Sequence, residues 1–103
     1  MIYEQRTYQT HPGKAPDFLQ LYEEEGLKII TRHALLAGCW VNDSGALDLV
    51  TFLWAYKDHG HRSDQNAKLD ADPDWRAFVP KVLPLVAHRD CVVLKPAVFS
   101  PLI

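Results

Sequence analysis

The segment LDLVTFLWAY, residues 47–56, decides the fold because it predicts a β-strand that is apolar on both faces. Side chains alternate between the two faces of a strand. The even-numbered residues from Val50 to Tyr56 therefore share one face, and the odd-numbered residues from Leu49 to Ala55 share the other. Because both faces are apolar, both must be covered by other parts of a protein.

Three more strands are predicted around this segment. Residues 38–42 precede it and are joined to it through Asp43-Ser44-Gly45, a typical hairpin turn. Residues 2–9 are rich in aromatic and β-branched side chains and end at a Pro-Gly turn. Residues 91–94 form the last strand and lead into an irregular tail.

A helix is predicted between the first two strands. It begins at Pro16 and Asp17 and carries an apolar stripe that reaches His33. Gly26 interrupts this helix, and a glycine inside a helix costs up to about 1 kcal/mol relative to alanine. We therefore expect a kink or a close contact of the backbone at Gly26.

Two further helices are predicted after the hairpin. The first is short and polar and spans residues 58–69. The second begins with Asp72 as its N-cap and Pro73 at its first position, and the apolar residues of segment 75–86 have helical spacing. A proline inside a helix removes a backbone hydrogen bond, so we expect a bend or a break near Pro80.

The order of these elements predicts an α+β fold of the ferredoxin-like βαββαβ type, with a four-stranded antiparallel sheet and one domain over residues 1–103. Helices cover only one face of such a sheet. The apolar second face therefore predicts a homodimer that packs sheet to sheet, as in a dimeric α/β barrel.

Composition excludes several classes of partner. A net charge of −2 provides no basic face for nucleic acid, and no apolar run is long enough to cross a membrane. The N-terminus lacks the pattern of a signal peptide, so we expect a cytoplasmic protein.

Cys39 and Cys91 lie in apolar strand-like segments, which favours buried, unreactive thiols over a disulfide or a reactive thiol. In the ferredoxin-like order they lie on opposite edges of the sheet, too far apart to bridge.

A polar row on the first strand is the main candidate site. Glu4, Arg6 and Tyr8 share one face, although alternation does not show which face that is. Arg6 could bind a carboxylate or another anion, and Glu4 could accept a proton or orient a ligand. The alternative is structural: Glu4 and Arg6 pair with each other and satisfy a polar interior.

An aromatic wall is predicted on the third strand from Phe52, Trp54 and Tyr56. Aromatic residues at strand spacing are usually part of the core. The alternative is a flat wall for an apolar or ring-containing ligand. Together with the polar row, these residues form the predicted ligand-binding set, with Glu4 and Arg6 as the catalytic candidates.

The histidines do not predict a metal or haem site. His59 and His61, with Asp58 and Asp64, lack a third ligand at a known spacing and fit a solvated helix start better. His33 and the isolated His88 fit hydrogen-bonded structural residues better than haem ligands. Motifs for a nucleophile, a phosphate loop and a zinc site are also missing, so no cofactor is expected.

Several segments resemble the NIPSNAP family, and the resemblance covers nearly the whole chain. It rests on Ile2-Tyr3-Glu4-Gln5-Arg6-Thr7-Tyr8 with Pro12-Gly13, Tyr22-Glu23-Glu24-Glu25-Gly26, Leu53-Trp54-Ala55-Tyr56, Asp72-Pro73-Asp74-Trp75 and Phe99-Ser100-Pro101-Leu102. The resemblance implies a ferredoxin-like domain of the dimeric α/β-barrel type. Its members are largely uncharacterised, so it implies no reaction.

The wider superfamily of this fold includes cofactor-independent monooxygenases, haem-degrading enzymes and small isomerases, an analogy at the level of the fold only. Many relatives have histidine where this chain has Phe52, so a proton-transfer role there is lost. Pro80 also stands where the family continues its helix. The expected function is small-molecule binding in the barrel cavity, with monooxygenase- or isomerase-like activity as an extension. The alternative is a non-catalytic dimeric interaction module.

Overall fold

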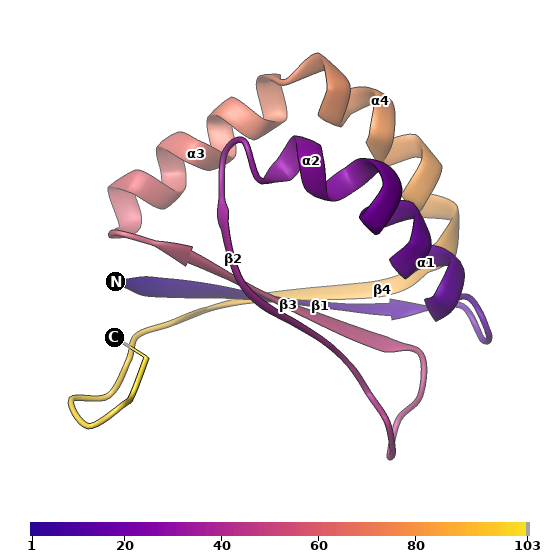
Figure 1. Ribbon diagram of the computed structural model, residues 1–103, viewed down its shortest axis with the longest axis horizontal. Coiled ribbons are helices and arrows are strands. Elements are labelled where there is room, and N and C mark those ends of the chain that lie inside the picture. Colours follow the sequence, from indigo (N-terminus) through magenta and orange to yellow (C-terminus); the bar gives the residue numbers. More distant parts are fainter. Residues whose placement is uncertain (103) are drawn as a thin grey trace.

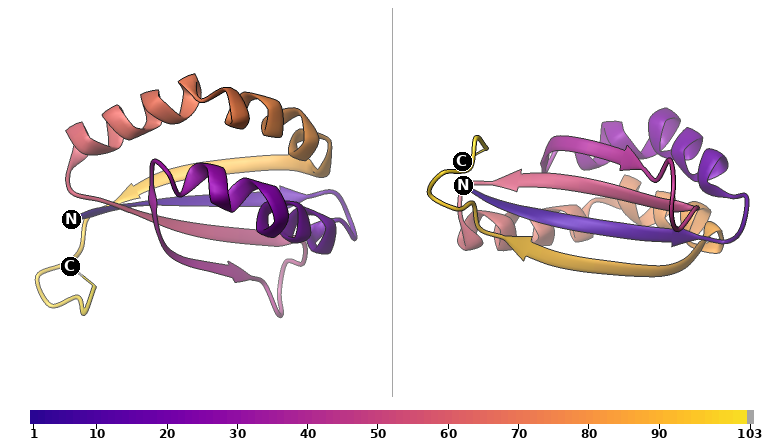
Figure 2. Two further views of the ribbon diagram at one scale, coloured as in Figure 1. Left: turned by 45° about the horizontal axis from the view of Figure 1, so that its top comes forward. Right: turned by 90° about the horizontal axis from the view of Figure 1, so that it is seen from below.

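One antiparallel sheet with the strand order β2-β3-β1-β4 underlies the structure (Figure 1), a computed structural model that describes residues 1–102. Neighbouring strands all pair antiparallel. This is the predicted ferredoxin-like topology, with β2 and β4 on opposite edges (Figure 2, right). The strands are β1 (Ile2–Thr10), β2 (Leu35–Val41), β3 (Leu49–Tyr56) and β4 (Val86–Leu94).

Both edge strands begin earlier than the sequence predicted. β2 begins at Leu35 instead of residue 38, and its register with β3 shifts between Leu36 and Gly38. Such a bulge breaks the alternation on which the prediction depended. β4 begins at Val86 instead of Cys91, because its first half is polar and exposed and follows directly on a segment with helical spacing.

The first helical region is continuous but changes from α-helix to π-helix and back to α-helix. It consists of α1 (Ala15–Leu21), a π-helical turn (Tyr22–Gly26) and α2 (Leu27–Ile30). A Cβ atom at Gly26 would lie 2.7 and 2.9 Å from ring carbons of Phe78 on a neighbouring helix. Of the two alternatives expected at Gly26, the close contact is therefore present, and the helix contains a π-helical turn there.

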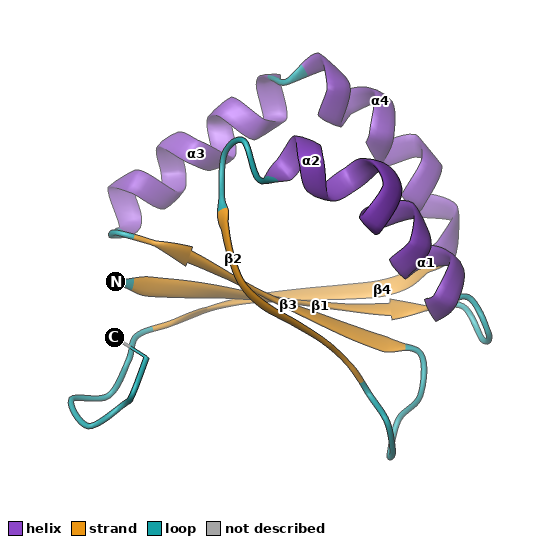
Figure 3. Cartoon of the chain, viewed as in Figure 1, coloured by secondary structure: helices purple, strands orange, loops and turns teal. Residues whose placement is uncertain are grey.

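The second helical region has two segments that meet at an angle (Figure 3). α3 (His59–Ala71) begins at the N-cap Asp58, whose carboxylate accepts from the amide of His61 at 2.8 Å. α4 (Pro73–Val82) begins at Asp72, as predicted, with a bond from the amide of Asp74 at 2.9 Å. α4 does not break at Pro80; it ends at Val82 and passes into a 3₁₀ turn (Leu83–Leu85). No helix within residues 1–102 is long and apolar enough to span a bilayer.

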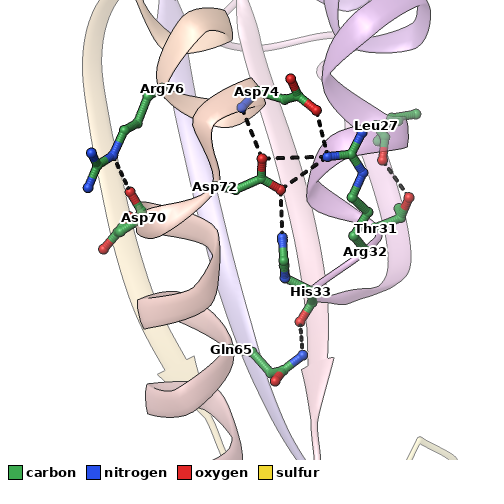
Figure 4. A network of polar contacts seen from close by, with 9 residues as sticks. All are labelled: Leu27, Thr31, Arg32, His33, Gln65, Asp70, Asp72, Asp74 and Arg76. Carbon is green, nitrogen blue, oxygen red and sulfur yellow. Dashed lines mark hydrogen bonds and ion pairs between the residues drawn. The ribbon is translucent and has the colours of Figure 1, made fainter.

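A polar network joins the end of α2 to the junction of α3 and α4 (Figure 4). The Asp72 carboxylate lies 2.8 Å from His33 Nε2 and 3.2 Å from Arg32 Nη1. Gln65 donates to the main-chain oxygen of His33 at 2.7 Å, and Arg32 also pairs with Asp74 at 2.9 Å. The hydrogen bond from His33 is the main reason that the pKa of Asp72 is lowered. His33 is therefore a hydrogen-bonded structural residue, as expected.

The helices cover one face of the sheet, and the other face is open (Figures 1 and 2). The core lies between the helices and the sheet and includes Phe18, Tyr22, Phe52, Trp54 and Phe78. On the open face, Leu35 and Trp40 are 65% and 56% exposed, and Val92 and Leu94 are exposed as well. Apolar side chains on this sheet face thus stay exposed in the single chain, whereas Tyr3 and Ala55 on the same face are buried.

The cysteines and the chain ends lie at the margins of the sheet. Cys39 and Cys91 are free and exposed, so the expectation of buried thiols is wrong, because both lie on edge strands with fewer neighbours. Tyr3 near the N-terminus pairs with Leu94 at the end of β4, so both ends leave the sheet on the same side (Figure 1). The tail that follows has no regular secondary structure and lies on the side away from the helices (Figure 3).

Gly26→Ala should destabilise the protein by about 1–3 kcal/mol, because the added methyl group would clash with the buried Phe78 ring. Gly60→Ala is a matched control in α3, where a Cβ would meet only Asp58 Oδ1 at 3.4 Å. It should be neutral or slightly stabilising, since alanine favours helices. Urea denaturation measures both, and equal stabilities of the two variants would contradict the packing argument.

Candidate functional site: a cavity between the helices and the sheet

The polar row of β1 faces the helices. Glu4, Arg6 and Tyr8 pair with Trp54, Phe52 and Val50 of β3, whose side chains belong to the core. The sequence could not assign this face, and the structure does. The row therefore faces the interior of one protomer and not the open side of the sheet.

Glu4 is a buried carboxylate held by two arginines. Its side chain is 0% exposed; Oε1 pairs with Arg6 Nε and Oε2 lies 2.7 Å from Arg62 Nε of α3. Burial alone would raise the pKa of Glu4, but the charges and hydrogen bonds of Arg6 and Arg62 lower it below its usual value. Glu4 is thus held ionised with both oxygens engaged, which favours the structural interpretation over an acid–base role.

A cavity of about 510 Å³ lies in front of this ion pair, between the β1–β4 half of the sheet and α3 and α4. Arg6, Tyr8, Arg89 and Cys91 come from the strands. The helical side is mostly apolar and includes Tyr22, Leu69, Trp75, Val79 and Val82. The size falls in the usual range of small-molecule sites. The lining mixes apolar side chains with polar ones, which also include Asn66, Asp70 and Asp90.

Arg6 joins the ion pair to the cavity. Its side chain is 26% exposed and lines the cavity, whereas Glu4 does not. Burial alone would lower the pKa of Arg6, but the neighbouring Tyr8 and Glu4 raise it above its usual value. Arg6 therefore presents a permanent positive charge at the floor of the cavity.

Tyr22 lies at the centre of the aromatic core and also lines the cavity. Its ring centroid is 4.9 Å from that of Phe18, 5.0 Å from Phe52 and 5.2 Å from Phe78. The residue is 4% exposed, and burial, followed by the neighbouring Tyr8, raises the pKa of its phenol well above the usual value. Tyr22 thus remains a neutral hydroxyl. The sequence indicated only its place in an apolar stripe.

The predicted aromatic wall lies in the core, outside the cavity. Phe52 and Trp54 are nearly inaccessible and stack with centroids 5.8 Å apart and planes at 8°. Tyr56 is also buried and donates to Asn66 Oδ1 at 3.4 Å. The cavity wall is formed instead by Trp75 of α4, which the sequence assigned to the core.

Two of the remaining histidines have local partners. His61 Nδ1 accepts from the amide of Lys57 at 3.1 Å, at the capped start of α3. His88 lies 3.2 Å from Asp90 on the surface. Within residues 1–102, no three His, Cys, Asp or Glu side chains gather as a metal site.

Glu4→Gln should lower the free energy of unfolding by about 3 kcal/mol, because it leaves Arg6 and Arg62 without a negative partner. The lowered pKa of Glu4 means that the ionised group stabilises the fold above the unfolded value of about 4.3. This contribution is lost as the pH falls through the folded pKa. The wild type should therefore lose stability on acidification more steeply than Glu4→Gln, as measured by urea denaturation at several pH values. The exposed Glu24→Gln serves as the control, and equal pH slopes for wild type and Glu4→Gln would contradict the prediction.

Comparison with known proteins agrees with the fold and shows the family. The chain is 50% identical to an uncharacterized NIPSNAP domain protein from Burkholderia xenovorans, with a TM-score of 0.95 over 98% of this chain and 99% of that one. It is 31% identical to human protein NipSnap homolog 3A over 77 residues, 74% of this chain and 31% of that protein. The chain spans between about a fifth and about a third of the length of the curated relatives it matches.

A more distant likeness extends to an antibiotic biosynthesis monooxygenase, with 17% identity and a TM-score of 0.68 over 94% of this chain and 99% of that one. At this identity only the fold is shared. The sequence profile of NIPSNAP, by contrast, matches residues 3–101. The ferredoxin-like fold, the segments conspicuous in the sequence and this match over nearly the whole length agree: the chain belongs to the NIPSNAP family.

Proposed function

We propose that each protomer binds a small molecule with an apolar body in the cavity between its helices and its sheet. The observation that carries this proposal is the cavity itself, about 510 Å³ with Arg6 and Tyr8 at its floor and Trp75 and Val79 in its wall. The cavity replaces the space between two sheets as the expected binding site, because the polar row faces the helices.

The cavity suits binding and hydrogen-bond donation better than proton abstraction. Glu4 lies behind Arg6 with both oxygens engaged. Arg6, Tyr8 and Tyr22 are among the polar groups that line the cavity, and all three can donate. A cofactor-free reaction of the monooxygenase or isomerase type would therefore use these donors to stabilise a developing oxyanion.

We also propose that the protein is a homodimer that packs through the open face of the sheet. Leu35, Trp40, Val92 and Leu94 give this face an exposed apolar surface, and the helices already occupy the other face. The tail carries the fully exposed Val98 and Phe99 on the same side. A second copy of the chain would cover the apolar sheet surface and the tail. The same dimer is the basis of the alternative function, a non-catalytic interaction module.

Val79→Trp should fill the cavity and abolish ligand binding without loss of the fold. The probe is the neutral fluorophore N-phenyl-1-naphthylamine, whose emission rises in apolar sites, and native mass spectrometry of purified protein reports any retained ligand. Ala77→Trp adds the same ring to α4 but outside this cavity, so it should bind like the wild type. Equal probe binding by both variants, with unchanged circular dichroism, would exclude the cavity as the site.

Trp40→Glu should convert the dimer to a monomer, because it places a charge on the exposed apolar surface of the proposed interface. Analytical ultracentrifugation should show the wild type at twice the chain mass of 11.7 kDa and the variant at that mass. Ala77→Glu on the helical side is the control and should remain dimeric. A monomeric wild type at micromolar concentration would refute the dimer.

A further inference from the structure

Arg89 is a second arginine of the cavity that the sequence did not single out. It pairs with Tyr8 across β1 and β4, so its side chain lies on the helix-facing side of the sheet. It lines the cavity together with Arg6. The sequence placed this residue before the last strand, where alternation could not be applied. Because β4 begins earlier, at Val86, Arg89 lies within the strand, and the alternation of the strand sets the direction of its side chain.

The carboxylates near Arg89 in the described part of the chain form no ion pair with it. Asp90 pairs with Thr7, so its side chain lies on the opposite face, where it contacts His88. Asp70 lines the cavity from α3 and is exposed. Among residues 1–102, Arg89 has no ion-pair partner, whereas Arg6 shares its charge with Glu4. The exposed Arg89 therefore contributes a positive charge, without an ion-pair partner among the described residues, to a cavity that Asp70 and Asp90 also line.

Three groups that can donate hydrogen bonds, Arg6, Tyr22 and Arg89, line the same cavity. Arg6 and Arg89 both act on the phenol of Tyr22, since their positive charges oppose the rise in its pKa that burial and Tyr8 produce. Tyr22 has a neutral hydroxyl, and the two arginines add charged donors to the same cavity. This combination suits an oxygen anion.

We infer that the ligand of this cavity carries an acid group, a carboxylate or a sulfonate, on an aromatic or branched apolar body. The acid group binds between Arg6 and Arg89 beside Tyr22, and the body packs against Trp75 and Val79. This inference rests on the proposed small-molecule function and adds the chemical class of the ligand. Arg89 is its specificity-determining residue.

A matched pair of probes tests the inference. 8-Anilinonaphthalene-1-sulfonate and N-phenyl-1-naphthylamine have the same ring system and differ in the sulfonate. The wild type should bind the sulfonate at least about tenfold more tightly, because a charge-assisted hydrogen bond contributes about 1.5–3 kcal/mol and a tenfold change corresponds to about 1.4 kcal/mol. Fluorescence titration at fixed salt gives both affinities, and Val79→Trp identifies the signal that comes from the cavity.

Arg89→Gln should weaken binding of the sulfonate about tenfold and leave the neutral probe within about twofold. Arg76→Gln is the control: it removes the same charge from the exposed side of α4, where Arg76 donates to the main chain of Asp70 at 2.7 Å. It should change neither affinity, and thermal melts check that both variants are folded.

The outcomes separate the inference from the function on which it rests. Equal affinities of the wild type for the two probes, or equal losses in Arg89→Gln and Arg76→Gln, would overturn the acid-group inference and leave cavity binding in place. If the wild type shows, for either probe, no signal that Val79→Trp removes, the proposed function is overturned as well.

Discussion

The buried carboxylate of Glu4 constrains the structure around it. An ionised group that is 0% exposed is tolerated only with charged partners, and Arg6 and Arg62 are those partners. Because Arg62 belongs to α3, the ion pairs fix this helix against the middle of the sheet. Arg6 is fixed at the same time, with its remaining surface directed into the cavity. One buried charge thus determines both the position of a helix and the electrostatic character of the cavity floor.

The π-helical turn Tyr22–Gly26 has a comparable role on the opposite side of the cavity. It brings Tyr22 into the aromatic core and sets Gly26 against Phe78 within one helical segment. π-Turns inside α-helices occur frequently at functional sites. The backbone irregularity and the cavity-lining phenol therefore belong to one feature, and the glycine is the residue that allows the helices to approach closely enough to form it.

Much of the fold could be predicted from the sequence, because the apolar alternation of β3, the hairpin turn and the Asp72 cap are local signals. The candidate site was predictable only in part. Arg6 and Tyr8 were found by alternation, but Arg62 and Arg89 were not, since their contacts join segments far apart in the chain. The exposure of the cysteines and the burial of the aromatic wall also depend on the order of strands and on which face the helices cover. Periodicity along a single strand does not contain that information.

The adjacent chain ends described above have a consequence for how this fold can be combined. Tyr3 and Leu94 pair on neighbouring strands, so entry and exit of the polypeptide lie within one strand spacing of each other. Another domain can be fused at either end, or the whole unit can be inserted into a surface loop of a host protein, without stretching the sheet. The domain can therefore be joined to another protein as one folded unit.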